Sequence, residues 1–221
     1  MKSEEHFHDC ADAYDDLIVG IVPDAPAFFG TVVSSLPDGE TSVLELGSGT
    51  GYVTEMVLRA STAASVTCID MDPAMLAVAR RKETLRGVSF LEGDFRDIWP
   101  EEQFDIVLTS LCLHHLSDQD RAAVVRRIHT TLRPGGIFVN GDVFRGVTSE
   151  EEERDCRLWQ QAMAENGLPV EEIEAMLARR EKNAACLNTL PGYLQKMKDA
   201  GFRQITCSYR HSIYAVVTCT R

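Results

Sequence analysis

Val43-Leu44-Glu45-Leu46-Gly47-Ser48-Gly49-Thr50-Gly51 is a short apolar run followed by three glycines at alternate positions. The run is too short for a helix and ends at glycine, which indicates a buried parallel strand. Glycine permits a sharp reversal of the chain and lets the backbone approach a ligand with no Cβ in the way. We therefore expect a strand, a turn and a helix, with a cofactor on the turn.

The spacing of the glycines separates two kinds of nucleotide site. Dinucleotide-binding turns follow G-x-G-x-x-G, which brings a pyrophosphate to a helix N-terminus, whereas this chain has G-x-G-x-G. Glu45 lies within the apolar strand just before the turn. Because an unpaired buried carboxylate is costly, we expect Glu45 to face the mouth of the pocket.

Together, Glu45, Gly47, Gly49 and Gly51 resemble the first motif of class I S-adenosylmethionine (SAM) dependent methyltransferases, acid-x-G-x-G-x-G. The resemblance implies that these four residues and Ser48 bind SAM. A plain tight connection from strand to helix is the alternative for this stretch taken alone, so the residues that follow have to decide.

A second predicted strand, residues 66–70, ends on an acid 23 positions after Gly47. One helix and one neighbouring parallel strand bring Asp70 beside the glycine turn, at the carboxyl edge where ligands bind. A carboxylate there can accept both ribose hydroxyls of an adenosine. Asp72 and Pro73 predict a helix N-cap and first position. This segment resembles the second motif of the family, which implies that Met71 packs on adenine.

A third strand, residues 88–94, also ends on an acid. The resemblance implies that Asp94 accepts the exocyclic amine of adenine and that Phe95 flanks the ring, roles that suit a carboxylate and an aromatic side chain. A helix cap is the alternative for Asp94, and a plain core position is the alternative for Phe95.

The fourth strand, residues 104–110, leads into the histidine pair His114 and His115. In the family the end of this strand lines the site of methyl transfer, which implies cofactor contacts for Ser110 and Leu111. A histidine there can act as a base near neutral pH, or it can simply bond the backbone. Adjacent residues of a regular element face different ways, and we expect His115 to face the pocket.

The remaining pattern predicts an α/β fold of the Rossmann-like, doubly wound type, with seven strands and an antiparallel last strand. We expect a helical lid at 1–41, a SAM-binding core at 42–143, a helical substrate cap at 144–189, and a helix and hairpin at 190–221, all in one domain. Tyr14 in the lid resembles a tyrosine that closes over the methionine end of SAM; a half-buried lid position is the alternative. Five cap residues could contact substrate, with core positions at helical spacing as the alternative: Trp159, Met163, Met176, Arg179 and Arg180.

Composition limits the partners. The 221 residues, 44% of them hydrophobic, can bury a proper core, and the formal charge of −12 disfavours a broad nucleic-acid surface. The seven cysteines form no C-x-x-C pair, so we expect no metal site. With no signal peptide or apolar run of membrane length, the protein is expected in the cytoplasm, and a homodimer is among the expected assemblies.

From these observations we expect an enzyme that moves the methyl group of SAM to an O, N, S or C atom of a small molecule. Three alternatives remain: a tRNA-modifying methyltransferase, which should have a basic face; a SAM-binding module without catalysis; and an NAD-dependent oxidoreductase. The glycine spacing and the terminal hairpin disfavour the last of these.

Overall fold

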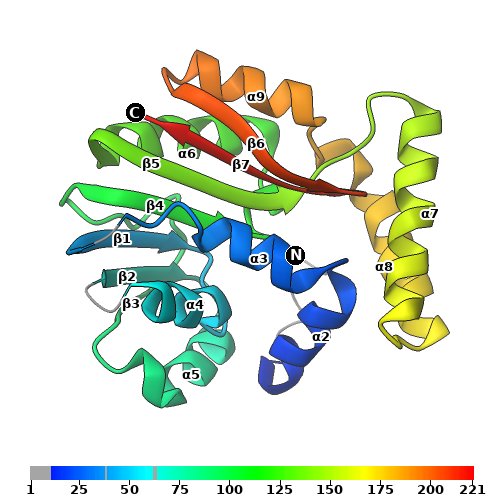
Figure 1. The fold of residues 1–221 in the computed structure, drawn as a ribbon, viewed down its shortest axis with the longest axis horizontal. Helices are drawn as coiled ribbons and strands as arrows, with labels where there is room; N and C mark the ends of the chain where they lie inside the picture. Colours follow the sequence, from blue (N-terminus) through cyan, green and yellow to red (C-terminus); the bar gives the residue numbers. More distant parts are fainter. Residues whose placement is uncertain (1–10, 38, 62–63) are drawn as a thin grey trace.

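A seven-stranded sheet in the order β3-β2-β1-β4-β5-β7-β6 forms the centre of the molecule (Figure 1). The computed structural model describes residues 11–37, 39–61 and 64–221. The strands are β1 Thr41–Leu46, β2 Ala64–Asp70, β3 Ser89–Glu92, β4 Phe104–Ser110, β5 Leu132–Val143, β6 Arg203–His211 and β7 Tyr214–Thr220.

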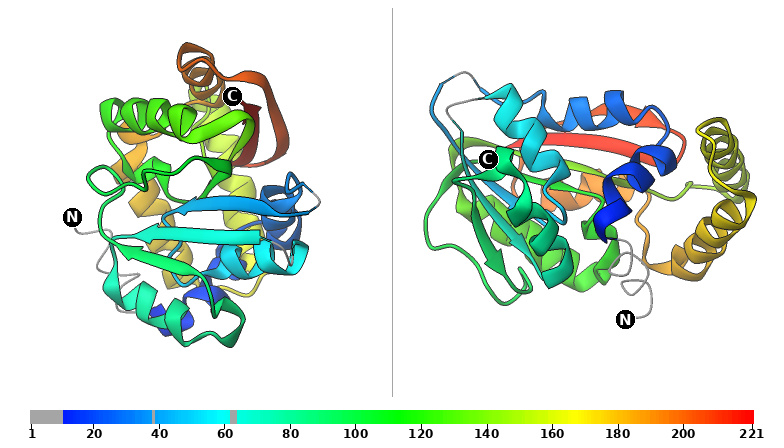
Figure 2. Two further views of the ribbon diagram at one scale, coloured as in Figure 1. Left: turned by 90° about the vertical axis from the view of Figure 1, so that its left-hand side faces the viewer. Right: turned by 90° about the horizontal axis from the view of Figure 1, so that it is seen from below.

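Helices cover both faces of this sheet, as the two views of Figure 2 show. Helices α3 and α4 pack against one face of the sheet, and helices α6 and α9 pack against the other face. The α-helices are α2 Tyr14–Ile21, α3 Ala25–Val33, α4 Tyr52–Ala60, α5 Pro73–Arg81, α6 Asp118–Thr131, α7 Ser149–Glu165, α8 Val170–Asn183 and α9 Leu190–Asp199. Short 3-10 turns are η1 Ala11–Ala13, η2 Glu83–Leu85, η3 Leu113–His115 and η4 Ala184–Cys186.

Strand β1 is buried between two parallel neighbours. Val43 pairs with Val66 of β2 on one side and with Ile106 of β4 on the other. Because all three strands run the same way, their carboxyl ends meet at one edge of the sheet. The glycine turn and Asp70 therefore come together, as the spacing in the sequence predicts.

The end of the chain distinguishes this sheet from a fully parallel one. Strand β7 lies between β5 and β6 and is antiparallel to both. The predicted fold, a doubly wound seven-stranded sheet with an antiparallel last strand, is confirmed.

A proline and two glycines lie within the longest strand. The stretch Pro134–Gly136 lies within β5, where a register shift follows the pairing of Phe104 with Leu132. A Cβ on Gly136 would lie 2.9 Å from the carbonyl oxygen of Asp105 on the neighbouring strand. Glycine is needed here because the two backbones approach closely.

The lid and the cap are joined by hydrogen bonds. Trp159 Nε1 of α7 donates to the carbonyl oxygen of Ile21 at 2.9 Å, and Asn166 Nδ2 donates to that of Gly20 at 3.0 Å. Helix α7 begins at Ser149, where the Thr148 hydroxyl caps it by accepting from the Glu151 N–H at 3.2 Å. The cap is therefore held against α2 and closes the same end of the sheet.

In the described part of the chain, no single helix has both the length and the apolar character needed to cross a membrane. The segments Ala11–Ile21 and Ala25–Val33 reach that threshold only as a pair, and the pair is bent by 104°.

Candidate active site

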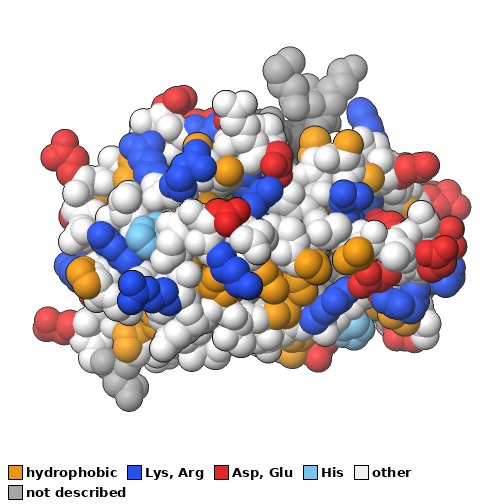
Figure 3. Space-filling model, turned by 90° about the horizontal axis from the view of Figure 1, so that it is seen from above, with side chains coloured by type: hydrophobic (Ala, Val, Ile, Leu, Met, Phe, Trp, Pro, Cys, Tyr) orange, Lys and Arg blue, Asp and Glu red, His pale blue; other side chains and the backbone are white. Residues whose placement is uncertain are grey.

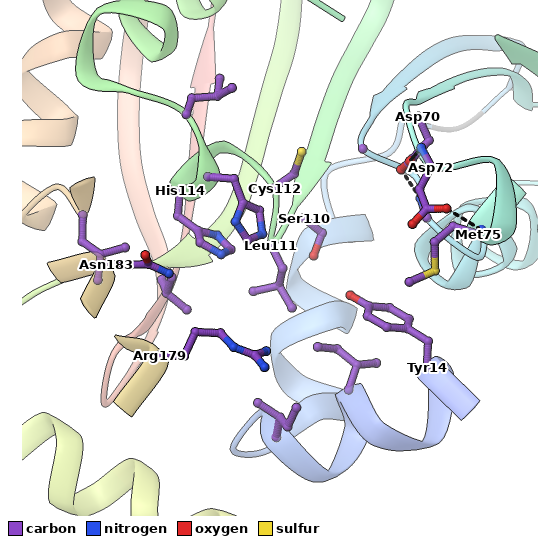
Figure 4. A pocket seen from close by; sticks show the side chains of 18 of the residues that line it. Tyr14, Asp70, Asp72, Met75, Ser110, Leu111, Cys112, His114, Arg179 and Asn183 are labelled. Carbon is purple, nitrogen blue, oxygen red and sulfur yellow. Dashed lines mark hydrogen bonds between the residues drawn. The ribbon is translucent and has the colours of Figure 1, made fainter. Parts of the chain in front are cut away.

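A cavity of about 320 Å³ lies at the carboxyl ends of β1, β2 and β4. Its walls come from the glycine turn, from α2 of the lid, and from α7 and α8 of the cap. Figure 4 shows Tyr14, Asp70 and Met75 on one side of this space and His114, Asn183 and Arg179 on the other. The predicted site residues that line it are Tyr14, Gly47, Gly49, Asp70, Met71, Asp94, Phe95, Ser110, Leu111, His114 and His115.

The three glycines of the turn serve two purposes. A Cβ on Gly47 would lie 2.2 Å from Cys112 Sγ, and one on Gly51 would lie 2.4 Å from Leu85 Cδ1, so packing requires glycine at both positions. Gly49 has a φ of 54°, lines the cavity, and has nothing within 4 Å of an added Cβ. Only Gly49 matches our expectation of a backbone left open toward ligand volume.

The carboxylate of Asp70 is held in place by two backbone N–H groups. Its Oδ2 accepts from the Gly49 N–H at 2.7 Å, and its Oδ1 accepts from the Asp72 N–H at 2.8 Å. Burial raises the pKa of Asp70, and these two hydrogen bonds oppose that rise. The carboxylate is thus fixed at the cavity wall, where its remaining lone pairs can accept from vicinal hydroxyls. Asp72 caps α5 as predicted, with Oδ1 accepting from the Ala74 N–H at 2.8 Å.

The carboxylate of Asp94 is bonded to Arg96, two residues further along the chain. Arg96 Nε donates to the two carboxylate oxygens of Asp94 at 3.0 and 2.9 Å, and Nη2 donates at 2.5 Å. These bonds lower the pKa of Asp94 and keep it charged. An adenine amine would share this carboxylate with Arg96. Phe95 is buried beside it and Met71 is exposed, and both line the cavity.

Three predicted cofactor residues do not line this cavity in the part of the chain that the structure describes: Glu45, Ser48 and Gly51. Glu45 points away from the pocket mouth, so our expectation for it is wrong. Its Oε2 accepts from Thr54 Oγ1 of α4 at 2.6 Å, and its side chain is 2% exposed. Burial raises the pKa of Glu45 to about 8, more than the Thr54 bond lowers it. The carboxyl is therefore protonated at neutral pH. A neutral carboxyl can be buried without a cation beside it, because it loses less hydration free energy than a carboxylate.

The chain leaves β4 through an unusual conformation at the cavity wall. Leu111 has a φ of 51°, in the left-handed region that residues with a Cβ seldom adopt. Its N–H donates to the carbonyl oxygen of Gly141 on β5 at 2.8 Å. Such strain is found where the surrounding structure fixes a functional segment, and here it sets Ser110, Leu111 and Cys112 along the cavity.

The turn η3 carries both histidines. His114 Nδ1 is 2.6 Å from Asp142 Oδ1, and the His114 N–H donates to Asp142 Oδ2 at 3.1 Å. Asp142 is 3% exposed, so this carboxylate is held within the protein. An aspartate bonded to Nδ1 fixes the proton on that nitrogen and leaves Nε2 as the acceptor.

Our expectation that only one histidine faces the pocket is wrong. Both line the cavity, because η3 is a tight 3-10 turn and the two rings lie together with centroids 3.9 Å apart. The pKa of His115 is lowered well below its usual value, first by the adjacent His114, then by burial and by Arg179. His115 is therefore neutral at physiological pH.

Two residues that support this turn were missed. Asp142 follows an apolar run at the carboxyl end of β5, the same signal that marked Asp70, and could have been found from it. Arg121 of α6 is 2% exposed, and its guanidinium donates to the carbonyl oxygens of Leu113 and Leu116, each at 2.9 Å. A basic residue on the buried stripe of α6 was the available signal.

The cap contributes a further part of the wall. Of the five predicted cap residues, Met163 is fully buried in the core, and the other four line the cavity: Trp159, Met176, Arg179 and Arg180. Asn183 lines it as well. Arg180 is anchored in the structure, since its Nε and Nη2 donate to the Glu152 carboxylate at 2.8 and 3.0 Å. Tyr14 faces the cavity from α2, as expected for the lid.

A sheet of this order, with a glycine turn after β1 and acids at the ends of the next two strands, defines the class I methyltransferase fold. Comparison with known proteins agrees. The model of the methyltransferase domain family matches residues 43–136. The solved DhpI–SAH complex superimposes with a TM-score of 0.68 at 22% identity, covering 97% of this chain and 93% of that one.

Two curated relatives match parts of the chain. An uncharacterized methyltransferase of Oceanobacillus iheyensis is 30% identical over 141 residues, which are 62% of this chain and 64% of the relative. A malonyl-[acyl-carrier protein] O-methyltransferase of Priestia megaterium is 27% identical over 111 residues, 50% of this chain and 40% of the relative. The chain thus spans less than two thirds of the length of either. Residues 43–136 thus match a methyltransferase domain, and the chain has the fold of class I SAM-dependent methyltransferases, including one solved with S-adenosylhomocysteine.

Proposed function

We propose that the protein transfers the methyl group of SAM to a nucleophilic atom of a small molecule. The observation that carries this proposal is one cavity that contains both Asp70 beside the glycine turn and His114 bonded to Asp142. A donor on the turn and an acceptor beside the histidine would meet inside this space.

The donor end fits an adenosine with an amino acid tail. Gly49 leaves the turn open, Asp70 presents a carboxylate for the ribose, and Asp94 with Phe95 borders the place of the base. When bound, SAM supplies an electrophilic methyl group on a sulfonium. The chain's own contribution is to orient the two partners and exclude water, effects worth on the order of 7–11 kcal/mol in well-oriented reactions. Tyr14 and Leu111 are placed to wall off the sulfonium.

His114 is the base that this geometry favours. Asp142 holds its Nδ1 and leaves Nε2 to take a proton from a hydroxyl or amine of the acceptor as the new bond to carbon forms. The pKa of His115 is lowered by His114, by burial and by Arg179, so this side chain is neutral. We assign it to the wall of the acceptor site.

The surface supports a small acceptor over a nucleic acid. On the face above α6 and α9, the described Lys and Arg side chains are separated by neutral and acidic ones, without a continuous basic surface (Figure 3). The formal charge of −12 acts in the same direction. The cap also closes the acceptor end of the cavity with Trp159 and Met176.

Calorimetry tests the donor half of the proposal. S-adenosylhomocysteine should bind the purified protein with a stoichiometry of about one, and NADH should not bind. Tritium from methyl-labelled SAM should then appear in a product when a metabolite extract is added. Binding of NADH in place of S-adenosylhomocysteine would contradict the proposal.

Replacing His114 by alanine tests the acceptor half. With the acceptor found in the labelling experiment, kcat should fall about 10²–10⁴-fold, because general base catalysis contributes that much. Asp142→Asn should give a similar loss, because it removes the carboxylate that orients the His114 ring. His115→Ala is the matched control, with an expected loss below about tenfold. Equal turnover of wild type and His114→Ala at every pH would remove His114 from the mechanism.

A further inference from the structure

The cavity has opposite charge at its two ends. Asp70 and Asp72 line the donor end, where the carboxylate of Asp94 is matched by Arg96. The cap end is lined by Arg179 and Arg180. A donor with a sulfonium suits the acidic end, so the cationic end belongs to the acceptor.

The two cap arginines differ in what they do. Arg180 is 7% exposed, bonded to the Glu152 carboxylate, and donates through Nη2 to the carbonyl oxygen of Phe144 at 2.8 Å, so it ties α8 to α7 and β5. The guanidinium of Arg179 extends from α8 into the cavity (Figure 4). Arg179 therefore places its positive charge in the acceptor space.

A second polar side chain shares this wall. Asn183 is four residues after Arg179 on α8, so the two project from the same face of the helix. Figure 4 shows His114, Asn183 and Arg179 on the same side of the cavity. Arg179 also contributes to the lowered pKa of His115, which is consistent with a guanidinium close to the histidine turn.

On these grounds, and resting on the function proposed above, we propose that the methyl acceptor carries an anionic acid group that binds to Arg179 and Asn183. A guanidinium presents two parallel N–H donors that match the oxygens of a carboxylate or phosphate, and the Asn183 amide can add a third donor. The acceptor hydroxyl or amine then lies toward His114. The X–H proton passes to His114 Nε2, X bonds to the methyl carbon, and the electron pair of the broken S–C bond stays on sulfur.

The test uses the protein loaded with S-adenosylhomocysteine and a panel of small hydroxycarboxylates, alkyl phosphates and the neutral amides of the same carboxylates. Binding is measured by calorimetry, and methyl transfer is measured in parallel with labelled SAM. We expect at least one of the acids to bind and its amide to bind about 30-fold more weakly or not at all. The carboxylate and phosphate arms show which acid group the site takes.

Three variants separate specific recognition from general effects. Arg179→Leu should weaken binding of that acid about 30-fold or more, and Arg179→Lys should lose less, because it keeps the charge without the paired donors. Lys182→Leu removes the same charge from an exposed position of α8 and should change nothing. Affinity for S-adenosylhomocysteine should be the same in all three.

Each result counts for or against the proposal. Equal affinity for acids and amides, no acid bound, or an unchanged Arg179→Leu would overturn the anionic acceptor while leaving the methyltransferase standing. Failure of the wild type to bind S-adenosylhomocysteine would instead contradict the proposed function itself.

Discussion

Replacing Asp70 by alanine should weaken S-adenosylhomocysteine binding about 100-fold or more, because two hydrogen bonds to a charged acceptor contribute about 1.5–3 kcal/mol each. The carboxylate is already fixed by the N–H groups of Gly49 and Asp72, so it needs no reordering when ribose hydroxyls arrive. Isothermal titration of wild type and variant measures the difference directly.

The same substitution also removes a brace from the glycine turn, so a second variant is needed. Asp70→Asn keeps one acceptor for the turn but lacks the charge, and it should lose affinity with a smaller fall in melting temperature than Asp70→Ala. Glu83→Ala, at an exposed position of η2, is the control and should bind as the wild type does. If Asp70→Asn and Asp70→Ala both bind normally, Asp70 does not contact the ligand.

Replacing Glu45 by glutamine should stabilise the protein at alkaline pH. Burial raises the pKa of Glu45 to about 8, so the folded state holds a proton that the unfolded chain releases near pH 4.5. The contribution of Glu45 to the free energy of unfolding is fully present below pH 4.5 and is lost as the pH rises to about 8. The difference between wild type and Glu45→Gln should therefore grow to on the order of 3–5 kcal/mol at pH 9.

Urea denaturation at pH 5, 7 and 9 measures this difference. Glutamine keeps an oxygen to accept from Thr54 Oγ1, so the variant should match the wild type at pH 5. Glu40→Gln, on an exposed side chain, is the control and should follow the wild type throughout. Parallel stability curves for wild type and Glu45→Gln would show that Glu45 is ionised in the folded protein at neutral pH.

The donor half of the site follows from local sequence. Short apolar runs ending in Asp70 and Asp94 predict parallel strands, and parallel strands place their carboxyl ends at one edge. The glycine spacing then indicates what binds there. No long-range contact is needed for these inferences, because strand period, turn residues and connection length already constrain them.

The acceptor half does not follow in the same way. His114 is matched with Asp142, which is 28 residues away in the chain, and both histidines face the cavity because the segment forms a 3-10 turn. Arg121 secures that turn from another helix. Each of these contacts depends on how separate helices and strands pack together. The spacing of residues along the chain does not reveal that packing.

Sequence alone thus determined the sheet, its antiparallel end and the edge at which a nucleotide-like donor would bind, because each depends on periodicity and chain connectivity. Only the tertiary structure decided the environment of Glu45 and the direction of Arg179. Alternation in β1 puts Glu45 on the face opposite Leu44 and Leu46. The hydrogen-bond donor on that face, Thr54, comes from α4, and only the packing of α4 on the sheet brings it there. The docking of α8 over the open end of the sheet turned Arg179 into the cavity, and the helical pattern of α8 does not specify that docking.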